Sequence, residues 1–160
     1  MLRKNKKLSN SLAKGRFAIV ASKYNARFVG AMLRGAQREL RRAGATVVHT
    51  VRVPGAFEIP VAAAKLARTV ERLDAILCLG VVIRGQTAHA KLIAESVTAA
   101  FAQLQLEREI PIIHEVLLLE NLEQAKARCL DPQRNRGVEA AQTALEMARV
   151  MRSLEIPRRL

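Results

Sequence analysis

The sequence has few aromatic residues: no Trp, one Tyr and four Phe among 160 residues. Proteins that bind single-stranded nucleic acids without sequence preference stack the bases on aromatic side chains, so this scarcity argues against that class. The motifs of the common nucleic-acid-binding folds are also missing from the sequence. We therefore expect a primary function other than nucleic-acid binding.

Long hydrophobic runs are absent as well. No stretch reaches the ~18 apolar residues that a membrane-spanning helix requires. The basic N-terminal segment is not followed by the apolar stretch and small-residue cleavage site of a secretory signal peptide. These absences predict a cytoplasmic protein that makes no use of a membrane.

Only two cysteines are present, Cys78 and Cys129, and both lie inside apolar segments. They do not have CxxC spacing, and no His lies near either of them in a metal-ligand pattern. Free Cys is among the most buried residue types. We therefore interpret both as buried thiols and predict no metal site.

Acidic residues are scarce relative to basic ones, with 14 Asp and Glu against 27 Lys and Arg, for a net charge of +13. The first 16 residues contain no acid, and their basic residues are Arg3, Lys4, Lys6, Lys7, Lys14 and Arg16. Runs of like charge are usually solvated and disordered. We predict a flexible basic arm over residues 1–15 and a single domain over residues 16–160, with nucleic acid as a minor alternative partner through this arm.

Buried strands and amphipathic helices alternate along the rest of the sequence. Apolar or β-branched runs predict strands at residues 17–22, 46–53, 75–83 and 112–119. Apolar residues at helical spacing predict helices at residues 28–43, 58–72, 89–107, 122–130 and 135–152. Such alternation is typical of a parallel sheet covered on both faces. The prediction is an α/β fold, a three-layer αβα sandwich with four parallel strands and the second strand at an edge.

A polar cluster follows the most apolar strand. Residues 75–83 are almost continuously apolar, and Arg84-Gly85-Gln86-Thr87 and His89 come directly after them. In open α/β sheets, ligands bind outside the carboxyl ends of the strands, and the free amides of a following helix favour anions. A core histidine would be poorly placed at such a turn, so we interpret His89 as a functional residue.

Three familiar catalytic motifs fail on inspection. Gly80 and Gly85 resemble part of a phosphate-binding P-loop, but Gln86 stands where the lysine is required. His114-Glu115 resembles the start of a zinc-protease motif, but Leu118 occupies the position of the second histidine. The signatures of Ser and Cys nucleophiles are missing.

Five segments of the sequence form an ordered set of motifs. They are YN (residues 24–25), VPGAFEIP (53–60), LGVVIRGQTAH (79–89), EQA (123–125) with Arg128, and EMA (146–148). In these segments and their order, residues 17–151 resemble the lumazine synthase family. The resemblance implies a flavodoxin-like fold and a transferase of riboflavin biosynthesis. The implied reaction condenses 5-amino-6-(D-ribitylamino)uracil with 3,4-dihydroxy-2-butanone 4-phosphate to 6,7-dimethyl-8-ribityllumazine, without a metal or organic cofactor.

The resemblance also implies roles for individual residues. His89 matches a histidine that transfers protons, which suits an imidazole because it can accept and release a proton near neutral pH. The implied phosphate site consists of Gly85, Gln86, Thr87 and Arg128. Tyr24 matches an aromatic residue that stacks on the pyrimidine ring. The other implied substrate-binding residues are Asn25, Ala56, Phe57, Glu58, Val81, Val82, Ile83, His114 and Arg136.

Four positions depart from the family pattern. His114-Glu115 stand where the family has an aromatic residue followed by Gly, Lys91 stands where an acid often follows the histidine, and Arg136 replaces a usual lysine. The departures leave an alternative function open. In that alternative the chain is a catalytically weakened relative that binds lumazine or flavin, or a structural shell protein.

Finally, the resemblance implies a homo-oligomer whose active sites are shared between neighbouring subunits. One subunit would supply Tyr24, Glu58 and His89, and its neighbour His114, Arg128 and Arg136. A homopentamer is then the smallest active unit, and an icosahedral capsid of sixty subunits is the larger alternative. In the family, members that stop at pentamers can carry extra residues between the last two helices, so the short segment 129–134 favours the capsid. Repulsion between crowded basic arms argues the other way. Association with riboflavin synthase is a further implied interaction.

Overall fold

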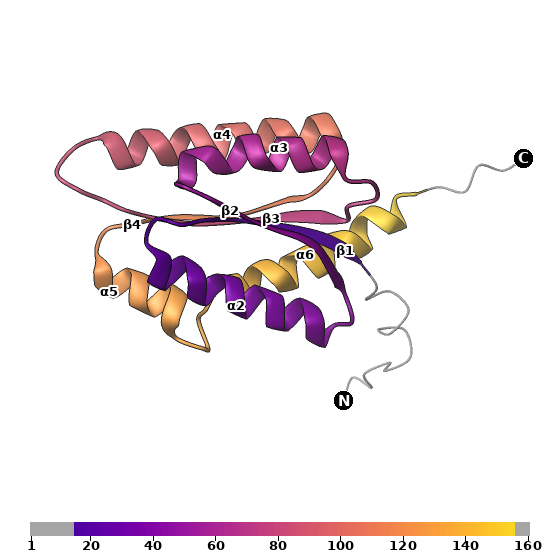
Figure 1. Cartoon of the computed structure of the whole chain (residues 1–160), viewed down its shortest axis with the longest axis horizontal. Coiled ribbons are helices and arrows are strands. Elements are labelled where there is room, and N and C mark those ends of the chain that lie inside the picture. Colours follow the sequence, from indigo (N-terminus) through magenta and orange to yellow (C-terminus); the bar gives the residue numbers. More distant parts are fainter. Residues whose placement is uncertain (1–14, 156–160) are drawn as a thin grey trace, which may run out of the picture.

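Four parallel strands form the middle layer of the fold (Figure 1). The computed structural model describes residues 15–155 of the chain. The strands are β1 (Arg16–Ser22), β2 (Thr46–Val53), β3 (Ala75–Ile83) and β4 (Ile112–Leu119), in the spatial order β2-β1-β3-β4. The predicted α/β sandwich with four parallel strands is confirmed, and so is the position of the second strand at an edge.

Two layers of helices cover the sheet, and Figure 1 shows which helices lie on each face. One layer contains α3 (Ile59–Thr69) and α4 (His89–Arg108). The other contains α2 (Ala26–Arg42), α5 (Leu122–Ala125) and α6 (Arg136–Ser153). A short 3-10 turn, Ala56–Glu58, precedes α3, and a π-helical turn, Lys126–Leu130, follows α5.

The two central strands are buried on both faces, as their continuous apolar sequences predict. In the paired segments, residues 17–21 of β1 lie opposite residues 75–79 of β3, and none of these ten residues has exposed area. In β2, by contrast, polar residues are interspersed with β-branched ones, and only Val53 is buried. Burial on both faces therefore fixes β1 and β3 at the centre of the sheet.

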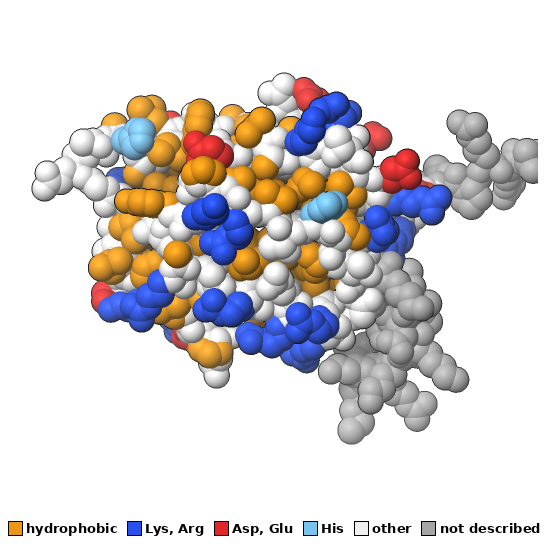
Figure 2. All heavy atoms as spheres, viewed as in Figure 1, with side chains coloured by type: hydrophobic (Ala, Val, Ile, Leu, Met, Phe, Trp, Pro, Cys, Tyr) orange, Lys and Arg blue, Asp and Glu red, His pale blue; other side chains and the backbone are white. Residues whose placement is uncertain are grey.

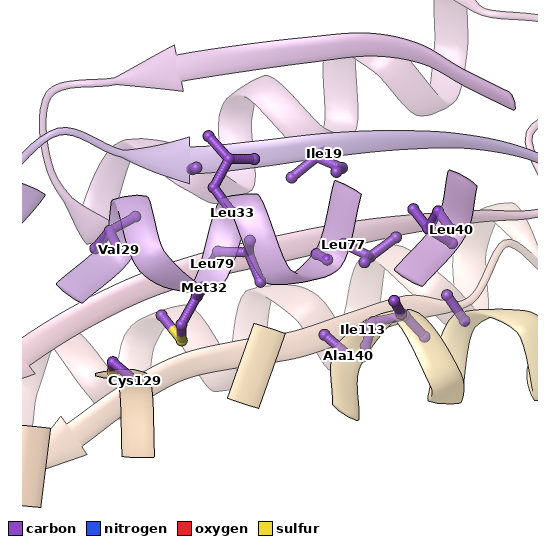
Figure 3. Packing of buried hydrophobic residues seen from close by; sticks show 14 of the residues in the cluster. Ile19, Val29, Met32, Leu33, Leu40, Leu77, Leu79, Ile113, Cys129 and Ala140 are labelled. Carbon is purple, nitrogen blue, oxygen red and sulfur yellow. The ribbon is translucent and has the colours of Figure 1, made fainter. Parts of the chain in front are cut away.

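The apolar stripe of α2 supplies much of the core on its side of the sheet, as Figure 3 shows. Its buried residues recur at helical spacing, so one side of the helix faces the strands. The labelled core residues in Figure 3 are Ile19, Val29, Met32, Leu33, Leu40, Leu77, Leu79, Ile113, Cys129 and Ala140. Both cysteines are free and buried, which confirms that part of their interpretation.

The structure differs from the sequence prediction in a few places. The helix predicted for residues 58–72 ends at Thr69, because Val70 is extended and Arg72 has a left-handed backbone with φ of 57°. The helix predicted for residues 122–130 is α5 followed by the π-helical turn. Among the described residues no helix is long and apolar enough to cross a membrane. The predicted arm lies, except for Gly15, outside the described residues.

A close helix crossing joins α2 to α6. Asn135 is buried just before α6, where its side-chain oxygen accepts hydrogen bonds from the N–H groups of Gly137 and Val138. Its side-chain amide donates to the carbonyl groups of Ala31 and Cys129. At Gly137 the two helices approach so closely that a Cβ would overlap the carbonyl of Met32. The crossing therefore requires glycine at position 137.

We expect Gly137→Ala to destabilise the protein by more than about 3 kcal/mol, because overpacking against backbone forces α2 and α6 apart. Gly30→Ala is a matched control on α2, since its added Cβ meets only the flexible end of Arg34. That control should be neutral or stabilising by up to about 1 kcal/mol, because Ala favours the helix. Urea unfolding of both variants at one protein concentration measures the difference, and equal stability would contradict the close crossing.

Candidate active site

A cavity of about 800 Å³ opens at the carboxyl ends of the strands. The chain leaves β1 toward β2 on one side, and β3 continues to β4 on the other side, so the strand order reverses between β1 and β3. Because of this reversal, the connections that follow β1 and β3 lead away from each other. Open α/β sheets bind ligands in the space between two such connections. The volume lies in the range of small-molecule sites.

The turn after β1 forms one wall of the cavity. The turn extends the pairing of β1 with β2 by two hydrogen bonds. The Lys23 N–H donates to the carbonyl of Val53, and the Tyr24 N–H donates to the carbonyl of Pro54. Asn25 adopts a left-handed backbone, and its side-chain amide donates to the carbonyl of Val81 at 2.7 Å. These bonds hold the turn against β3, while the Tyr24 side chain is 74% exposed at the cavity.

The 3-10 turn after β2 forms a second wall. Oε2 of Glu58 accepts a hydrogen bond from the Gly55 N–H at 2.9 Å, which fixes the carboxylate beside the cavity. Phe57 also lines the cavity and is 61% exposed. The turn thus presents one aromatic face and one anchored carboxylate to a ligand.

The end of β3 and the start of α4 complete the cavity. Residues 81–83 line it, and His89, the first residue of α4, lies exposed at its edge. The backbone N–H of His89 donates to Oγ1 of Thr87 at 3.4 Å. The Arg84 N–H donates to the carbonyl of Leu119 at 2.7 Å, so the start of this turn is fixed to the end of β4.

Most of the residues implied for the site between positions 24 and 89 lie together around this cavity. They are Tyr24, Asn25, Ala56, Phe57, Glu58, Val81, Val82, Ile83, Gly85, Thr87 and His89. Gln86 belongs to the same turn but does not line the cavity. The sequence interpretation missed Gly55, Ala90, Leu92, Ile93 and Ser96, which also line it. Ala90, Leu92, Ile93 and Ser96 follow His89 at helical spacing. This spacing was the signal in the sequence that groups them on one face of a helix.

Three implied site residues lie outside the cavity of their own chain: His114, Arg128 and Arg136. His114 belongs to β4, which is an edge strand. Arg128 is exposed in the π-helical turn, and Arg136 begins α6. The expectation that these residues complete the site of a neighbouring subunit stays a prediction.

Both ring nitrogens of His114 are hydrogen-bonded, Nδ1 within β4 and Nε2 to α4. Nδ1 accepts a hydrogen bond from the Val116 N–H at 3.2 Å, so the ring proton belongs on Nε2, which donates to Oγ1 of Thr98 at 2.8 Å. The ring also meets Phe101 edge to face, with 5.0 Å between centroids. Desolvation in these surroundings lowers the pKa of His114, which favours the neutral ring.

Glu115 and Arg136 form a two-pronged ion pair between β4 and α6. Nε and Nη2 of Arg136 donate to the two carboxylate oxygens of Glu115 at 3.0 and 2.9 Å, and Nη1 donates to Glu139. Glu115 is only 6% exposed. Burial raises the pKa of the Glu115 carboxyl above its ordinary value, while the hydrogen bonds and charge of Arg136 oppose the rise. The charge of Glu115 therefore depends on Arg136.

Metal ligands are not clustered in the described part of the chain: residues 15–155 contain no group of three or more His, Cys, Asp or Glu side chains that could hold an ion. Burial raises the pKa of the Cys78 thiol, and it raises that of Cys129 to about 11. Both thiols are therefore protonated at neutral pH and are poor nucleophiles.

Comparisons with known proteins agree on one family. A family model described as 6,7-dimethyl-8-ribityllumazine synthase matches residues 14–152. Among proteins of that name, one from Salinibacter ruber is 42% identical over 142 residues, which cover 88% of this chain and 90% of the relative. One from Halorhodospira halophila is 41% identical over 147 residues, covering 91% and 94%. One from Clostridium kluyveri is 40% identical over 142 residues, covering 88% and 92%.

We expect Arg136→Ala to destabilise the protein by about 2–3 kcal/mol at neutral pH, because it leaves the charge of Glu115 buried without its partner. Without Arg136 the pKa of Glu115 in the folded protein rises further above its value in the unfolded chain. Protonation removes the buried charge, so stability is recovered as the carboxyl becomes protonated. The cost should therefore shrink as the pH falls through the folded-state pKa toward the ordinary value of 4.5.

Urea unfolding at neutral and mildly acidic pH measures this dependence. The control is the double variant Glu115→Gln/Arg136→Ala, which has no buried charge and should lack the pH-dependent part. An Arg136→Ala penalty that is the same at both pH values would contradict the assigned role of the ion pair.

Proposed function

Because the chain belongs to the 6,7-dimethyl-8-ribityllumazine synthase family, we propose that the cavity at the strand ends is its active site. The chain is an enzyme of riboflavin biosynthesis with 6,7-dimethyl-8-ribityllumazine synthase activity. The observation that carries the proposal is the convergence of Tyr24, Glu58 and His89 on one cavity from three separate connections.

The pyrimidine substrate is assigned to the part of the cavity between the aromatic residues and β3. Tyr24 and Phe57 are exposed there and offer flat faces to a planar ring. Backbone groups of residues 81–83 are held by the sheet, so they can orient the ring edge with little motion. Because Oε2 of Glu58 is occupied by Gly55, Oε1 is assigned to the ribityl hydroxyl groups.

The phosphate of the second substrate is assigned to the turn Gly85-Gln86-Thr87. This turn leads into α4, whose first backbone N–H groups have no carbonyl partners within the helix and favour an anion. Arg128 from a neighbouring subunit is assigned to the other side of the phosphate, where a guanidinium can bind two oxygens at once. This assignment explains why Arg128 lies away from the cavity of its own chain.

His89 is assigned the proton transfers. Imine formation, phosphate elimination and ring closure each move protons between substrate atoms and the enzyme. His89 lines the cavity two residues after Thr87 of the phosphate turn, so its imidazole is assigned to the atoms next to the leaving phosphate. A ring nitrogen of an imidazole can accept a proton and then donate it, so one side chain can serve transfers in both directions.

We expect His89→Ala to lower kcat by about 10²–10⁴-fold while KM for the pyrimidine changes little, because it removes acid–base catalysis but no pyrimidine contact. Steady-state kinetics of lumazine formation measure both constants. His49→Ala is the matched control, since His49 is exposed on β2 and does not line the cavity. A His89→Ala enzyme with the kcat of the unmodified protein would contradict the assignment.

The family is typically oligomeric, and we propose a homopentamer with shared active sites for this chain. Three large apolar side chains of the cavity are exposed: Tyr24 at 74%, Phe57 at 61% and Leu92 at 58%. Both β2 and β4 are edge strands with unpaired backbone groups. Covering this surface with the β4 side of a neighbour fits one head-to-tail contact that repeats around a closed ring.

Three further proposals follow from family membership. The pentamers assemble into an icosahedral capsid of sixty subunits, and the assembly associates with riboflavin synthase. The enzyme works in the cytoplasm, which fits its two free, buried cysteines.

Shared sites predict that two defective variants restore each other. At a low concentration of the phosphate substrate, His89→Ala and Arg128→Ala should each be slow, the second because its KM rises. In mixed pentamers some sites combine His89 of an Arg128→Ala subunit with Arg128 of a His89→Ala subunit. Random mixing in equal amounts makes about a quarter of the sites intact. Lumazine formation by the coexpressed variants should therefore approach a quarter of the unmodified rate.

The control for this experiment coexpresses His89→Ala with the double variant His89→Ala/Arg128→Ala, which leaves no site with His89. Its rate should not exceed that of His89→Ala alone. If the two single variants together give only the sum of their separate rates, His89 and Arg128 do not meet between subunits.

A further inference from the structure

Helix α2 carries a concentration of positive charge that the proposed function does not use. Its 17 residues include five arginines and a single acid, Glu39. Helix α4 is longer, at 20 residues, but has equal numbers of basic and acidic residues. The excess positive charge of the described part of the chain is therefore distributed unevenly and is largest on α2.

The arginines of α2 lie on its solvent side. They are Arg27, Arg34, Arg38, Arg41 and Arg42, here called the α2 arginine stripe, and all are exposed. At 3.6 residues per turn these positions fall on one face, opposite the buried residues. Figure 2 shows Lys and Arg side chains gathered along the lower margin of this view, where Figure 1 places α2.

Most of this charge is not neutralised by the chain itself. Arg42 lies 3.5 Å from Glu39, but its side chain is 77% exposed. Within residues 15–155, no carboxylate forms a salt bridge with Arg34, Arg38 or Arg41. Like charges three or four residues apart destabilise a helix. The stripe therefore weakens α2 unless an external anion binds it.

The surface around the stripe narrows the choice of partner. Of the large apolar side chains exposed in the described part of the chain, none belongs to α2. A protein partner would lack the buried apolar anchors that carry most binding energy. An amphipathic membrane helix needs apolar side chains beside its basic ones. A polymer of regularly spaced negative charges needs only the arginines.

The spacing of the phosphates in nucleic acid suits the spacing of these arginines along the helix. Arg34 and Arg41 lie seven residues apart, which is about 10 Å along the helix. This is the axial length of about three phosphates of one DNA strand, at about 3.4 Å each. The three unpaired arginines can therefore contact phosphates within about three such steps along one strand.

The sequence adds charge at one end of the stripe. Residues 1–14 contain five Lys and Arg and no acid. They join the described structure at Gly15, whose carbonyl accepts a hydrogen bond from the Thr46 N–H at 2.9 Å. Thr46 follows Arg42 by four residues, so the basic segment is attached beside the C-terminal end of the stripe.

We propose that the α2 arginine stripe is a binding site for the phosphate backbone of nucleic acid, independent of base sequence. Contacts to phosphates carry no sequence information, and aromatic residues for base stacking are scarce here. The site uses no residue of the active-site cavity, so it is a second function beside lumazine synthesis.

The test measures binding of a short fluorescent DNA duplex to the full-length protein by fluorescence anisotropy at several salt concentrations. The unmodified protein should bind with an affinity that falls steeply with salt. The triple variant Arg34→Gln/Arg38→Gln/Arg41→Gln should bind at least about tenfold more weakly at low salt. The slope of log K against log salt should fall by about 2–3, because each lost phosphate contact removes about 0.9.

A charge-matched control removes three exposed basic residues from the opposite helix layer: Lys65→Gln/Arg68→Gln/Arg108→Gln. It should change the slope by less than about 1. Equal losses in both triple variants would overturn the proposal, because the binding would then follow net charge alone. Absence of binding by the unmodified protein, or binding to phosphatidylserine vesicles but not to DNA, would overturn it as well.

Two further measurements separate loss of binding from loss of folding. The α2 triple variant should retain the lumazine-forming rate of the unmodified protein. The variant Arg34→Lys/Arg38→Lys/Arg41→Lys keeps the charge and should keep the salt slope, so a loss of binding here would contradict phosphate contacts. The DNA titration measures binding and requires no turnover. Its result therefore does not depend on whether the proposed active site is correct.

Discussion

The cavity that we propose as the active site depends on the parallel pairing of β1 with β3. Both strands are buried on both faces, and residues 17–21 lie opposite residues 75–79. The chain leaves these two central strands in opposite directions across the sheet, toward β2 and toward β4. Their connections therefore separate at the carboxyl end and leave room for a ligand. The hydrogen bond from Asn25 to the carbonyl of Val81 then joins the turn after β1 to β3 beside that space.

The same topology keeps His114, Arg128 and Arg136 outside the cavity of their own chain. Strand β4 lies at the edge, so His114 and Glu115 cannot reach the cavity beside β1, and Arg128 and Arg136 follow β4 in the sequence. Both substitutions in β4 are held by neighbouring elements, His114 by α4 and Glu115 by Arg136. The departures from the family pattern are therefore built into stable contacts. We infer that they give the β4 surface a fixed shape and charge for the neighbouring subunit.

The sequence predicted the fold more completely than the site. The bounds of β3 were correct because a continuous apolar run ends sharply at Arg84. The end of α3 was wrong because Val70 and Glu71 fit a helical pattern, and the left-handed conformation of Arg72 has no signal in its residue type. Leu92 and Ser96 share one face of α4 with His89 by their spacing, but the contact of this face with the cavity is visible only in the packed fold. Glu115 and Arg136 are 21 residues apart in the sequence. Their ion pair could therefore be predicted only once the relative positions of β4 and α6 were known.

The central claim is that one chain supplies the phosphate turn and a neighbour supplies Arg128. A structure of the assembled protein with inorganic phosphate bound tests it most directly. The account predicts a phosphate at residues 85–87, in contact with the first N–H groups of α4 and with the guanidinium of Arg128 of the partner subunit. A phosphate bound at that turn with no Arg128 from any subunit within hydrogen-bond distance would contradict it.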